Sequence, residues 1–499
     1  MQLSKIIAAL PNEPVKVAGP ADRDITSLTH DSRQAGPDSL FVALPSVTPG
    51  RRGEAAAGGA NFILQAVDQG AAAVITSSEI DAPRATVIRV QEPRVALSAA
   101  AAAFYGHPSL QLQTAGITGT NGKTTVAFLL KHLLDVADRP CGLIGTVRYV
   151  IGPRVLPAAR TTPEADDVQR LLREMRDVNC RAAVMETSSH ALEQDRVRDV
   201  EFDAAVFTNL TQDHLDYHET MEAYFAAKSR LFEQLASQAH KRGTAVINID
   251  DRYGRRLFDS VGQRVNTITY GQASNAMFRA TDLRTDLHGT QYSLHASGKS
   301  YLVRLPLFGP FNVYNSLAAL ASMQALGHDV RKSVDALKNA PQVPGRLEMV
   351  PGPKTFRVFV DYAHTPDALE NVLRTLRALE PQRLITVFGC GGDRDKAKRG
   401  PMGRAAEELS DWCVVTSDNP RSEDPEAICA QISAGLRGGN HETILDRRAA
   451  IRRAVAMAGP GDIVLIAGKG HEDYQEFADR KVPFDDVAEA ESAIRGRAA

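Results

Sequence analysis

Apolar and polar positions change their pattern along this chain of 499 residues, and the first change closes a small N-terminal segment. The short apolar runs SLFVALPSV and GAAAVITSS are typical of strands, and they flank a loop rich in glycine and alanine, GRRGEAAAGGA. The alanine-rich run PRVALSAAAAAFYGHPS then predicts a helix that ends at Gly106 and Pro108. We therefore predict a small mixed α/β domain over residues 1–107.

From residue 108 onward, apolar runs alternate with segments of helical periodicity. Strands are predicted at LQTAGIT, RAAVMET, FDAAVFTN and GTAVINID, and a helix at KTTVAFLLKHLLDVA. This alternation is typical of a parallel sheet with helices packed against it. The segment NAPQVPGRLE, rich in proline and glycine, indicates a linker, so we predict a central α/β domain over residues 108–341.

A third set of apolar runs, FRVFVDY, RLITVFG, DWCVVTS and DIVLIAG, predicts a Rossmann-like domain over residues 342–499. Each run is followed directly by a polar loop: DYAHTPD, GCGGDRDK, TSDNPR and AGKGHE. Ligands of such sheets collect at the carboxyl ends of the parallel strands. We therefore expect the four polar loops to share one crevice.

Composition and charge narrow the class of protein. The chain is 43% hydrophobic and 24% charged, with a formal net charge of -2, which gives no electrostatic reason to expect nucleic acid or an anionic membrane as partner. Its five cysteines are widely spaced and contain no C-x-x-C, which argues against a disulfide framework and a zinc site. No apolar run is long enough for a signal peptide or a membrane span. We expect a cytoplasmic protein.

The stretch AGITGTNGKTT, residues 115–125, is the strongest candidate for a ligand site. A glycine-rich turn between a strand and a helix points backbone N–H groups at phosphate oxygens, Lys123 adds a positive charge, and Thr124 supplies a hydroxyl for Mg²⁺. The spacing differs from the usual phosphate loop, because five residues rather than four separate Gly116 from Gly122. An ordinary glycine-rich turn is the alternative, but the order of strand, loop, lysine, hydroxyl and helix favours phosphate binding.

Two further polar clusters follow predicted strands. Glu186 ends the strand in METSSH, where a carboxylate can complete the coordination of Mg²⁺. Another predicted strand is followed by a polar cluster within ten residues: Asn209, Asp213, His214, Asp216 and His218. The two histidines suit a zinc site, but the H-x-x-x-H spacing fits one face of a helical turn equally well. Lys228, in AYFAAKSRL, has a pattern typical of a solvent-exposed lysine on an amphipathic helix.

Nine segments, in this order along the chain, resemble the Mur ligase family: TGTNGKTT, METSSH, TNLTQDHLDYH, FGPFNVYN, GRLE, VDYAHTPDAL, GGDRDKAKRGPM, SDNPRSEDP and AGKGHEDYQ. The resemblance covers essentially the whole chain. It implies three domains, which bind a UDP-sugar, ATP and an amino acid, and an ATP-dependent amide ligase of peptidoglycan precursor synthesis. ATP would phosphorylate the D-glutamate carboxylate of UDP-N-acetylmuramoyl-L-alanyl-D-glutamate, and an amine of meso-2,6-diaminopimelate would attack the acyl phosphate.

The resemblance also implies roles on the ATP side. The residues that resemble the ATP-binding groups are Gly119, Thr120, Asn121, Gly122, Lys123, Thr124, Thr125, Asn315, Arg346 and Asp361. Thr124 and Glu186 resemble the ligands of one Mg²⁺, and His214 and Lys228 those of a second. Lys228 would be carbamylated, which turns its ammonium into a carboxylate-like ligand. Lys123, Lys228 and His214 are the catalytic candidates.

The other two substrates have candidates of their own. Residues that resemble contacts to the UDP-sugar-peptide are Ser32, Thr161, Thr162, Ser188, Gln194 and Arg196. Residues that resemble contacts to diaminopimelate are Arg394, Asp418, Asn419, Pro420, Arg421, Gly468 and Glu472. The Arg421 fork, on a turn stiffened by Pro420, suits a planar carboxylate, and Glu472 suits an ammonium. The loop after LFVAL is longer than is usual in the family, so uracil contacts near residues 47–49 depart from its pattern.

Three alternatives stay open. An L-lysine-adding ligase of the same family would lack the arginine of SDNPR. A folylpolyglutamate synthetase shares the ATPase core but has no use for a UDP-sugar domain, SDNPR or GKGHE. A nucleotide-binding regulatory module would keep GTNGKTT without a reason to keep the metal set or four polar loops. Phosphate release with a full set of substrates separates these functions.

Overall fold

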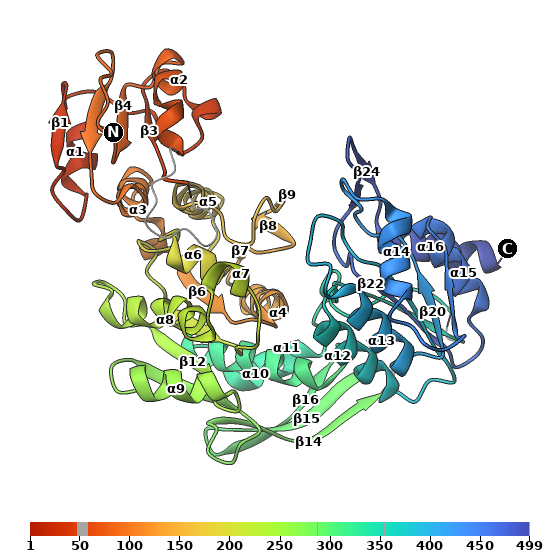
Figure 1. Cartoon of the computed structure of the whole chain (residues 1–499). Coiled ribbons are helices and arrows are strands. Elements are labelled where there is room, and N and C mark those ends of the chain that lie inside the picture. The colour runs from red at the N-terminus through yellow and green to blue at the C-terminus, as the bar shows by residue number, and fades with distance from the viewer. Residues whose placement is uncertain (47–57, 287, 354, 499) are drawn as a thin grey trace. The chain divides into compact units, whose positions relative to one another are not determined.

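The computed structural model describes residues 1–46, 58–286, 288–353 and 355–498 (Figure 1). The chain divides into two compact units. One unit comprises residues 1–281, 294–301 and 314–336, and the other residues 282–293, 302–313 and 337–499. The loop at residues 47–49, considered above for uracil contacts, lies outside the described residues.

The N-terminal sheet has five strands in the order β1-β5-β4-β3-β2. Its strands are β1 (Lys16–Ala18), β2 (Ser27–Thr29), β3 (Ser39–Val42), β4 (Ala73–Thr76) and β5 (Thr86–Arg89), and only β1 pairs antiparallel. The helices are α1 (Leu3–Ala8), α2 (Ile63–Asp68) and α3 (Pro93–Phe104), with a 3₁₀ turn, η1 (Ser32–Gln34). The strands β3 and β4 and the alanine-rich helix α3 confirm the elements predicted from the sequence.

The central sheet has eleven strands in the order β16-β15-β14-β13-β12-β11-β6-β10-β7-β8-β9. Its parallel strands are β6 (Gln113–Thr118), β7 (Cys141–Ile144), β10 (Ala182–Glu186), β11 (Ala204–Phe207), β12 (Thr244–Asn248), β13 (Asn266–Gly271) and β14 (Phe278–Asp286). Four of them are the strands predicted from apolar runs. Buried on both faces, such strands are almost continuously apolar, which is why the sequence shows them clearly.

The predicted parallel sheet forms the middle of the domain, but one edge of the central sheet is antiparallel. The strands β8 (Arg148–Ile151) and β9 (Arg154–Pro157) pair antiparallel with β7 and with each other. They are joined by a turn at Gly152, whose φ of +55° suits glycine. At the other end lie β15 (Gly289–Ala296) and β16 (Lys299–Leu305). Along β15 buried and half-buried positions alternate, a weaker pattern than the buried runs.

The helices of the central part are α4 (Lys123–Val136), α5 (Ala165–Asp177), α6 (Ser189–Glu193), α7 (Leu215–His218), α8 (Met221–Ser237), α9 (Arg252–Val261), α10 (Pro310–Ala325) and α11 (Val330–Leu337). In α8, the Thr220 side chain caps the first turn by accepting a hydrogen bond from the Ala223 N–H. The apolar face of α8 carries Tyr224, Leu231 and Leu235, and Lys228 stands in the same stripe, four residues after Tyr224. The helix therefore turns this lysine towards the core.

The C-terminal sheet has six strands in the order β17-β18-β22-β19-β20-β21. They are β17 (Glu348–Met349), β18 (Arg357–Asp361), β19 (Leu384–Phe388), β20 (Trp412–Val415), β21 (His441–Thr443) and β22 (Ile463–Ala467), all parallel except β17. The helices are α12 (Pro366–Arg377), α13 (Arg399–Leu409), α14 (Pro425–Ser433), α15 (Arg447–Met457) and α16 (Asp486–Ala498). A hairpin, β23 (Tyr474–Glu476) and β24 (Lys481–Pro483), follows β22.

Two apolar clusters cover the two faces of this C-terminal sheet. One includes Phe359 and Leu465, and the other includes Val358 and Val464, their neighbours along the same strands. The predicted strands β18, β19, β20 and β22 are confirmed, and their carboxyl ends meet at one edge of the sheet because all four run parallel. Among the helices of the described residues, none combines the length and the apolar character needed to cross a membrane.

Candidate functional site

The loop between β6 and α4 has the backbone geometry of a phosphate-binding turn. Gly119 and Gly122 adopt φ angles of +148° and +86°, which side chains rarely tolerate. A Cβ on Gly119 would collide with the hydroxyl of Thr208, and one on Gly122 with the amide oxygen of Asn315. Asn315 lies on α10, so the fold brings this predicted ATP-binding residue against the loop.

Lys123 is the first residue of α4, and its ammonium folds back over the loop. Its Nζ donates to the carbonyl oxygens of Gly119 at 2.9 Å and Thr120 at 2.8 Å. Asn121 is held by the segment that follows β11, since its N–H donates to the Asn209 side chain at 2.9 Å. The helix N-terminus and the ammonium therefore meet at one corner of the loop, the arrangement that phosphate binding requires.

Thr124 and Glu186 meet next to this corner. The Thr124 hydroxyl donates to Glu186 Oε2 at 3.0 Å, and both side chains are buried. Thr146 holds the same carboxylate through its N–H, 2.8 Å from Oε1, and its hydroxyl, 3.0 Å from Oε2. A buried hydroxyl and carboxylate beside a phosphate loop are the oxygen donors that Mg²⁺ prefers, so these residues fit the ion. Thr146 has no distinctive motif and was missed in the sequence.

Lys228 is buried, and the interpretation as a solvent-exposed lysine is wrong. Its side chain is 1% exposed, its Nζ donates to the Gly119 carbonyl at 2.8 Å, and it lies 4.5 Å from the centre of the Tyr224 ring. Burial, together with the charge of Lys123, lowers its pKa well below the ordinary value of a lysine. Lys123 and Lys228 therefore approach one carbonyl from two elements, and the second amine is the one driven towards its neutral form.

The two histidines of H-x-x-x-H have different surroundings. His218 is buried, with Nε2 2.9 Å from the Ser189 hydroxyl and Nδ1 3.1 Å from the Glu193 carboxylate. His214 is half exposed and directly precedes α7, with a φ of +52°. Burial lowers the pKa of His214, and the charges of the nearby lysines act in the same direction. His218 is thus held by protein partners, and the pair does not form a metal-ligand cluster within the described part of the chain.

The predicted contacts to the sugar-peptide gather at the end of β10. The Thr162 hydroxyl donates to the Glu186 carbonyl at 2.7 Å and accepts from the Ser188 N–H at 3.1 Å. Thr161 Oγ1 lies 3.1 Å from Thr146 Oγ1. Arg196 donates to the Thr162 carbonyl at 2.9 Å and to the Gln194 amide oxygen at 2.8 Å.

A buried carboxylate supports this group. Glu164 is 2.6 Å from Arg160, 2.9 Å from Arg196 and 3.2 Å from Arg94, so α3 of the N-terminal domain shares it with the central domain. Ser32 lies on η1, where its hydroxyl donates to the Gln65 amide oxygen at 3.2 Å. None of these bonds joins Ser32 to the residues around Glu186.

A second contact joins the N-terminal domain to α5. His30 Nδ1 lies 2.8 Å from a carboxylate oxygen of Asp166, and Asp167 completes the three-residue group of the described chain whose side chains could hold a metal ion. Burial lowers the pKa of His30, but the hydrogen bond and charge of Asp166 outweigh it and leave the pKa raised. The pair therefore acts as an ionic link between the segment that carries Ser32 and the central domain.

In the second unit, Asp361 ends β18 and is fixed by two backbone N–H groups. Leu347 donates to it at 2.6 Å and Ala363 at 2.8 Å, while burial raises its pKa to about 6. The Arg346 guanidinium lies 4.9 Å from the centre of the Tyr362 ring. The predicted nucleotide contacts Arg346 and Asp361 thus lie on neighbouring segments of one unit. In the sequence, both are far from the predicted contacts on the phosphate loop.

The DNPR turn after β20 meets the loop after β22, as the crevice hypothesis requires. The Asn419 amide donates to Glu472 at 2.7 Å and accepts from Lys469, whose Nζ is 2.9 Å away. Gly468 has a φ of +117°, and a Cβ on it would lie 2.6 Å from a carboxylate oxygen of Asp418. Four predicted diaminopimelate contacts, Asp418, Asn419, Gly468 and Glu472, are therefore neighbours.

The two arginines predicted for carboxylate binding flank Gly391. A Cβ on that glycine would lie 3.0 Å from Arg421 Nη1 and 3.7 Å from Arg394 Cγ. Arg394 is exposed, whereas the Arg421 side chain is 22% exposed and donates to Glu476 and to the Gly392 carbonyl.

Arg447 is a supporting residue that the sequence did not reveal. It is fully buried at the start of α15, donates twice to Asp486 at 2.8 and 2.7 Å, and lies 4.0 Å from Asp418. Its contacts span 20 to 39 positions of the chain, so no local motif marks it. The Arg447 guanidinium thus places a buried positive charge next to the Asp418 carboxylate.

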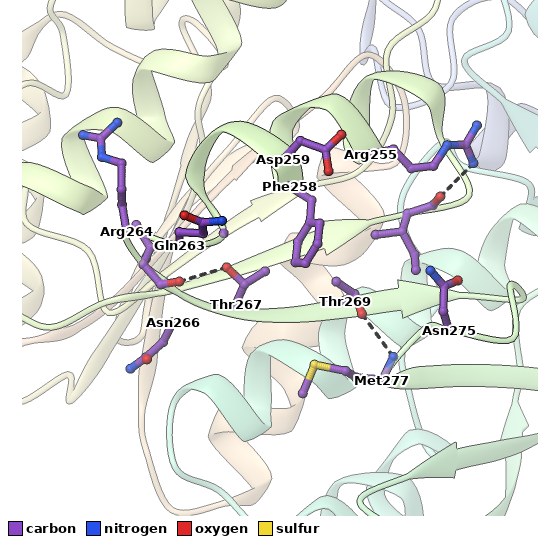
Figure 2. A pocket seen from close by; sticks show the side chains of 13 residues that line it. Arg255, Phe258, Asp259, Gln263, Arg264, Asn266, Thr267, Thr269, Asn275 and Met277 are labelled. Atoms are coloured by element: carbon purple, nitrogen blue, oxygen red, sulfur yellow. Dashed lines mark hydrogen bonds between the residues drawn. The ribbon is translucent and has the colours of Figure 1, made fainter.

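A cavity of about 710 Å³ lies elsewhere, along α9 and β13. Figure 2 shows the ring of Phe258 pointing from the helix towards the strand that carries Thr267 and Thr269, with Met277 next to Thr269. Its polar groups are partly used within the wall: the Met277 N–H donates to Thr269 Oγ1 at 3.1 Å. None of the sequence-predicted site residues lines this cavity, so it is separate from the clusters described above.

Comparison with known proteins decides the family. Residues 117–323 match the Mur ligase middle domain, and residues 345–470 match the Mur ligase glutamate ligase domain. A UDP-N-acetylmuramoyl-L-alanyl-D-glutamate–2,6-diaminopimelate ligase of Syntrophomonas wolfei is 41% identical over 99% of both chains. The chain belongs to the Mur ligase family. It is an ATP-dependent amide ligase of the Mur type, as its sequence motifs imply.

Solved structures give the same Mur ligase architecture. A structure of a protein of the same name, a 2,6-diaminopimelate ligase, superposes with a TM-score of 0.72 at 34% identity, covering 99% of both chains. A folylpolyglutamate synthase of Mycobacterium tuberculosis superposes with a TM-score of 0.60 at 21% identity, covering 74% of this chain and 91% of its own. The second likeness is one of fold. The predicted three-domain α/β architecture of this Mur ligase is confirmed.

Proposed function

We propose that this Mur ligase joins meso-2,6-diaminopimelate to the D-glutamate of UDP-N-acetylmuramoyl-L-alanyl-D-glutamate in cytoplasmic peptidoglycan precursor synthesis. The observation that carries the proposal is identity of 41% across 99% of a ligase named for this substrate pair. The clustering of Asp418, Asn419, Gly468 and Glu472 supports it, because it offers carboxylate and amide groups to a zwitterion.

The reaction begins with activation of a carboxylate. A free carboxylate is a poor acyl donor, so transfer of the γ-phosphoryl group of ATP to the D-glutamate carboxylate forms an acyl phosphate and ADP. The N-terminus of α4 and the Lys123 ammonium offset charge on the phosphoryl oxygens during transfer. Attack by the incoming amine forms a tetrahedral intermediate, and its collapse expels phosphate and leaves the amide.

Thr124 and Glu186 would hold one Mg²⁺, and His214 and a carbamylated Lys228 would contribute to a second. When bound, Mg²⁺ supplies positive charge that neutralises the phosphate oxygens. The chain itself fixes the Glu186 carboxylate through Thr146, and Thr124 approaches it from the helix that carries Lys123. Thr162 connects this corner to Ser188, and Arg196 connects it to Gln194, so the proposed sugar-peptide contacts adjoin the proposed phosphate site.

The decisive test is turnover with a complete substrate set. Phosphate release should require ATP, Mg²⁺, the UDP-muramoyl dipeptide and meso-diaminopimelate together, and the product should gain one diaminopimelate residue by mass. Turnover with tetrahydrofolate and glutamate instead would show a folylpolyglutamate synthetase. ATP binding without turnover on any acceptor would indicate a regulatory module.

We expect selectivity for meso-diaminopimelate over L-lysine that depends on Arg421. Lysine lacks the distal carboxylate and cannot use the guanidinium, a loss of about 2–3 kcal/mol for a charge-assisted pair of a partly buried group. Arg421→Ala should therefore lower kcat/KM for diaminopimelate about 30- to 150-fold and leave the slow reaction with lysine nearly unchanged. Steady-state kinetics with both amino acids measure this. Equal wild-type efficiency with both would contradict this role of Arg421, and a preference for lysine would assign the chain to a lysine-adding ligase.

A further inference from the structure

The β23–β24 hairpin, residues 474–483, closes on the DNPR turn through contacts from both main chain and side chain. The Gln475 amide donates to the Asp418 carbonyl at 2.9 Å, and the Glu476 N–H donates to the Asn419 side chain at 3.0 Å. The Glu476 carbonyl accepts the Arg421 N–H at 3.0 Å. The hairpin thus forms hydrogen bonds with three residues of the turn, Asp418, Asn419 and Arg421.

Arg421 needs such support because its backbone is unusual. Its φ is +53°, a left-handed value that residues other than glycine rarely adopt. Its Nε donates to Glu476 Oε2 at 2.9 Å, and its Nη1 donates to the Gly392 carbonyl at 2.8 Å. Of the five N–H donors of a guanidinium, three are bonded to no group within the described residues. The direction of the unbonded N–H groups of Arg421 therefore depends on Glu476 and the Gly392 carbonyl, which hold the rest of the guanidinium.

Glu476 is itself held by two cations. Its Oε1 lies 3.4 Å from the Lys481 ammonium across the hairpin, while Oε2 holds Arg421. Partial burial raises the pKa of Glu476, but the charges of Lys481 and Arg421 outweigh it and keep the pKa below its ordinary value. The carboxylate therefore stays ionised at neutral pH, and Lys481 offsets the negative charge that would otherwise repel an anionic ligand near Arg421.

We propose that Glu476 is a positioning residue that orients Arg421 for the distal carboxylate of the amino-acid substrate, and so sets specificity through the hairpin. This inference rests on the proposed diaminopimelate site. Glu476 does not contact substrate in this proposal. It restricts the Arg421 guanidinium to one rotamer and turns its unbonded N–H groups away from the hairpin, which reduces the ordering required when a carboxylate binds.

Glu476→Ala should raise KM for meso-diaminopimelate about tenfold, with kcat and the KM values for ATP and the UDP-sugar-peptide changed less than about twofold. Glu476→Gln, which keeps an acceptor for Arg421 Nε, should recover part of the loss. The preference for diaminopimelate over lysine should fall with the same variant. Glu370→Ala, which removes an exposed carboxylate paired with Arg374 on α12, is the matched control and should behave as wild type.

A double-mutant cycle separates positioning from a general structural role. In the Arg421→Ala background, removal of the Glu476 side chain should cost nothing further, because the group that it orients is gone. An equal additional loss in that background, or equal losses for all three substrates, would show that Glu476 only stabilises the hairpin. A lower KM in Glu476→Ala would show that its carboxylate competes with the substrate, which also overturns the proposal. Wild-type turnover with diaminopimelate is measured first, so failure of the proposed function is seen separately.

Discussion

Lys123→Ala is expected to lose at least about 100-fold in kcat, the range found when one preorganised donor to a transition-state oxygen is removed. The variant keeps the glycine turn but lacks the ammonium that folds over Gly119 and Thr120. Charge that builds on the transferred phosphoryl oxygens then loses one of the positive groups that offset it, and the helix N-terminus and bound Mg²⁺ do not replace the ammonium. Phosphate release under saturating substrates measures the loss.

The control for this variant lies on the same helix. Lys131→Ala removes a lysine of α4 whose partner is Asp135, four residues on, an exposed type of pair that contributes little. It should retain wild-type turnover and a similar melting temperature. If folded Lys123→Ala turned over at nearly the wild-type rate, the assignment of the phosphate loop would be wrong, whatever the identity of the acceptor.

The strands and their polar ends could be predicted because they depend on local pattern. A strand buried on both faces, such as β10 or β22, is an almost continuous apolar run, and polar residues such as Thr187 and Lys469 follow within two positions of its end. The strands β8 and β9 are four residues long and partly exposed, so they gave no such signal. Their antiparallel pairing follows from a tight glycine turn rather than from apolar content.

The side chains that support the site could not be predicted in the same way. Glu476 meets Arg421 across 55 positions and Glu164 meets Arg94 across 70, and neither distance leaves a trace in local periodicity. Lys228 is the instructive error, because its charge was given more weight than its place in the stripe of α8. Four residues after Tyr224 and three before Leu231, it occupies a position that the helix buries whatever the side chain.

The burial of Lys228 supports the proposed carbamate, and loss of that group is the second large effect expected. An amine reacts with CO₂ only in its neutral form, giving a carbamate and a proton. Burial lowers the pKa of Lys228 well below its ordinary value, which favours that neutral form. A carbamate would place oxygen atoms near the phosphate loop, where the ammonium now donates to Gly119. We expect activity to depend on dissolved CO₂ and to fall as the pH drops and protonation competes.

Lys228→Ala should reduce kcat by at least about 100-fold. Removing a residue that only supports a metal ligand usually lowers activity about 10- to 100-fold, and removing a proposed ligand itself should cost no less. The fold should survive, since the substitution removes a costly buried amine and leaves Leu231 and Tyr224 in place. Glu233→Ala, at an exposed position of α8, controls for effects on the helix. Formate or acetate should restore part of the activity of Lys228→Ala by supplying a carboxylate to the vacated space, and should not help Lys123→Ala. Full activity of Lys228→Ala without added carboxylate would contradict the carbamate. The carbamate would also be contradicted if the intact wild-type protein showed no added mass of CO₂ and kept its activity when CO₂ is depleted; Lys228 would then act as an unmodified amine.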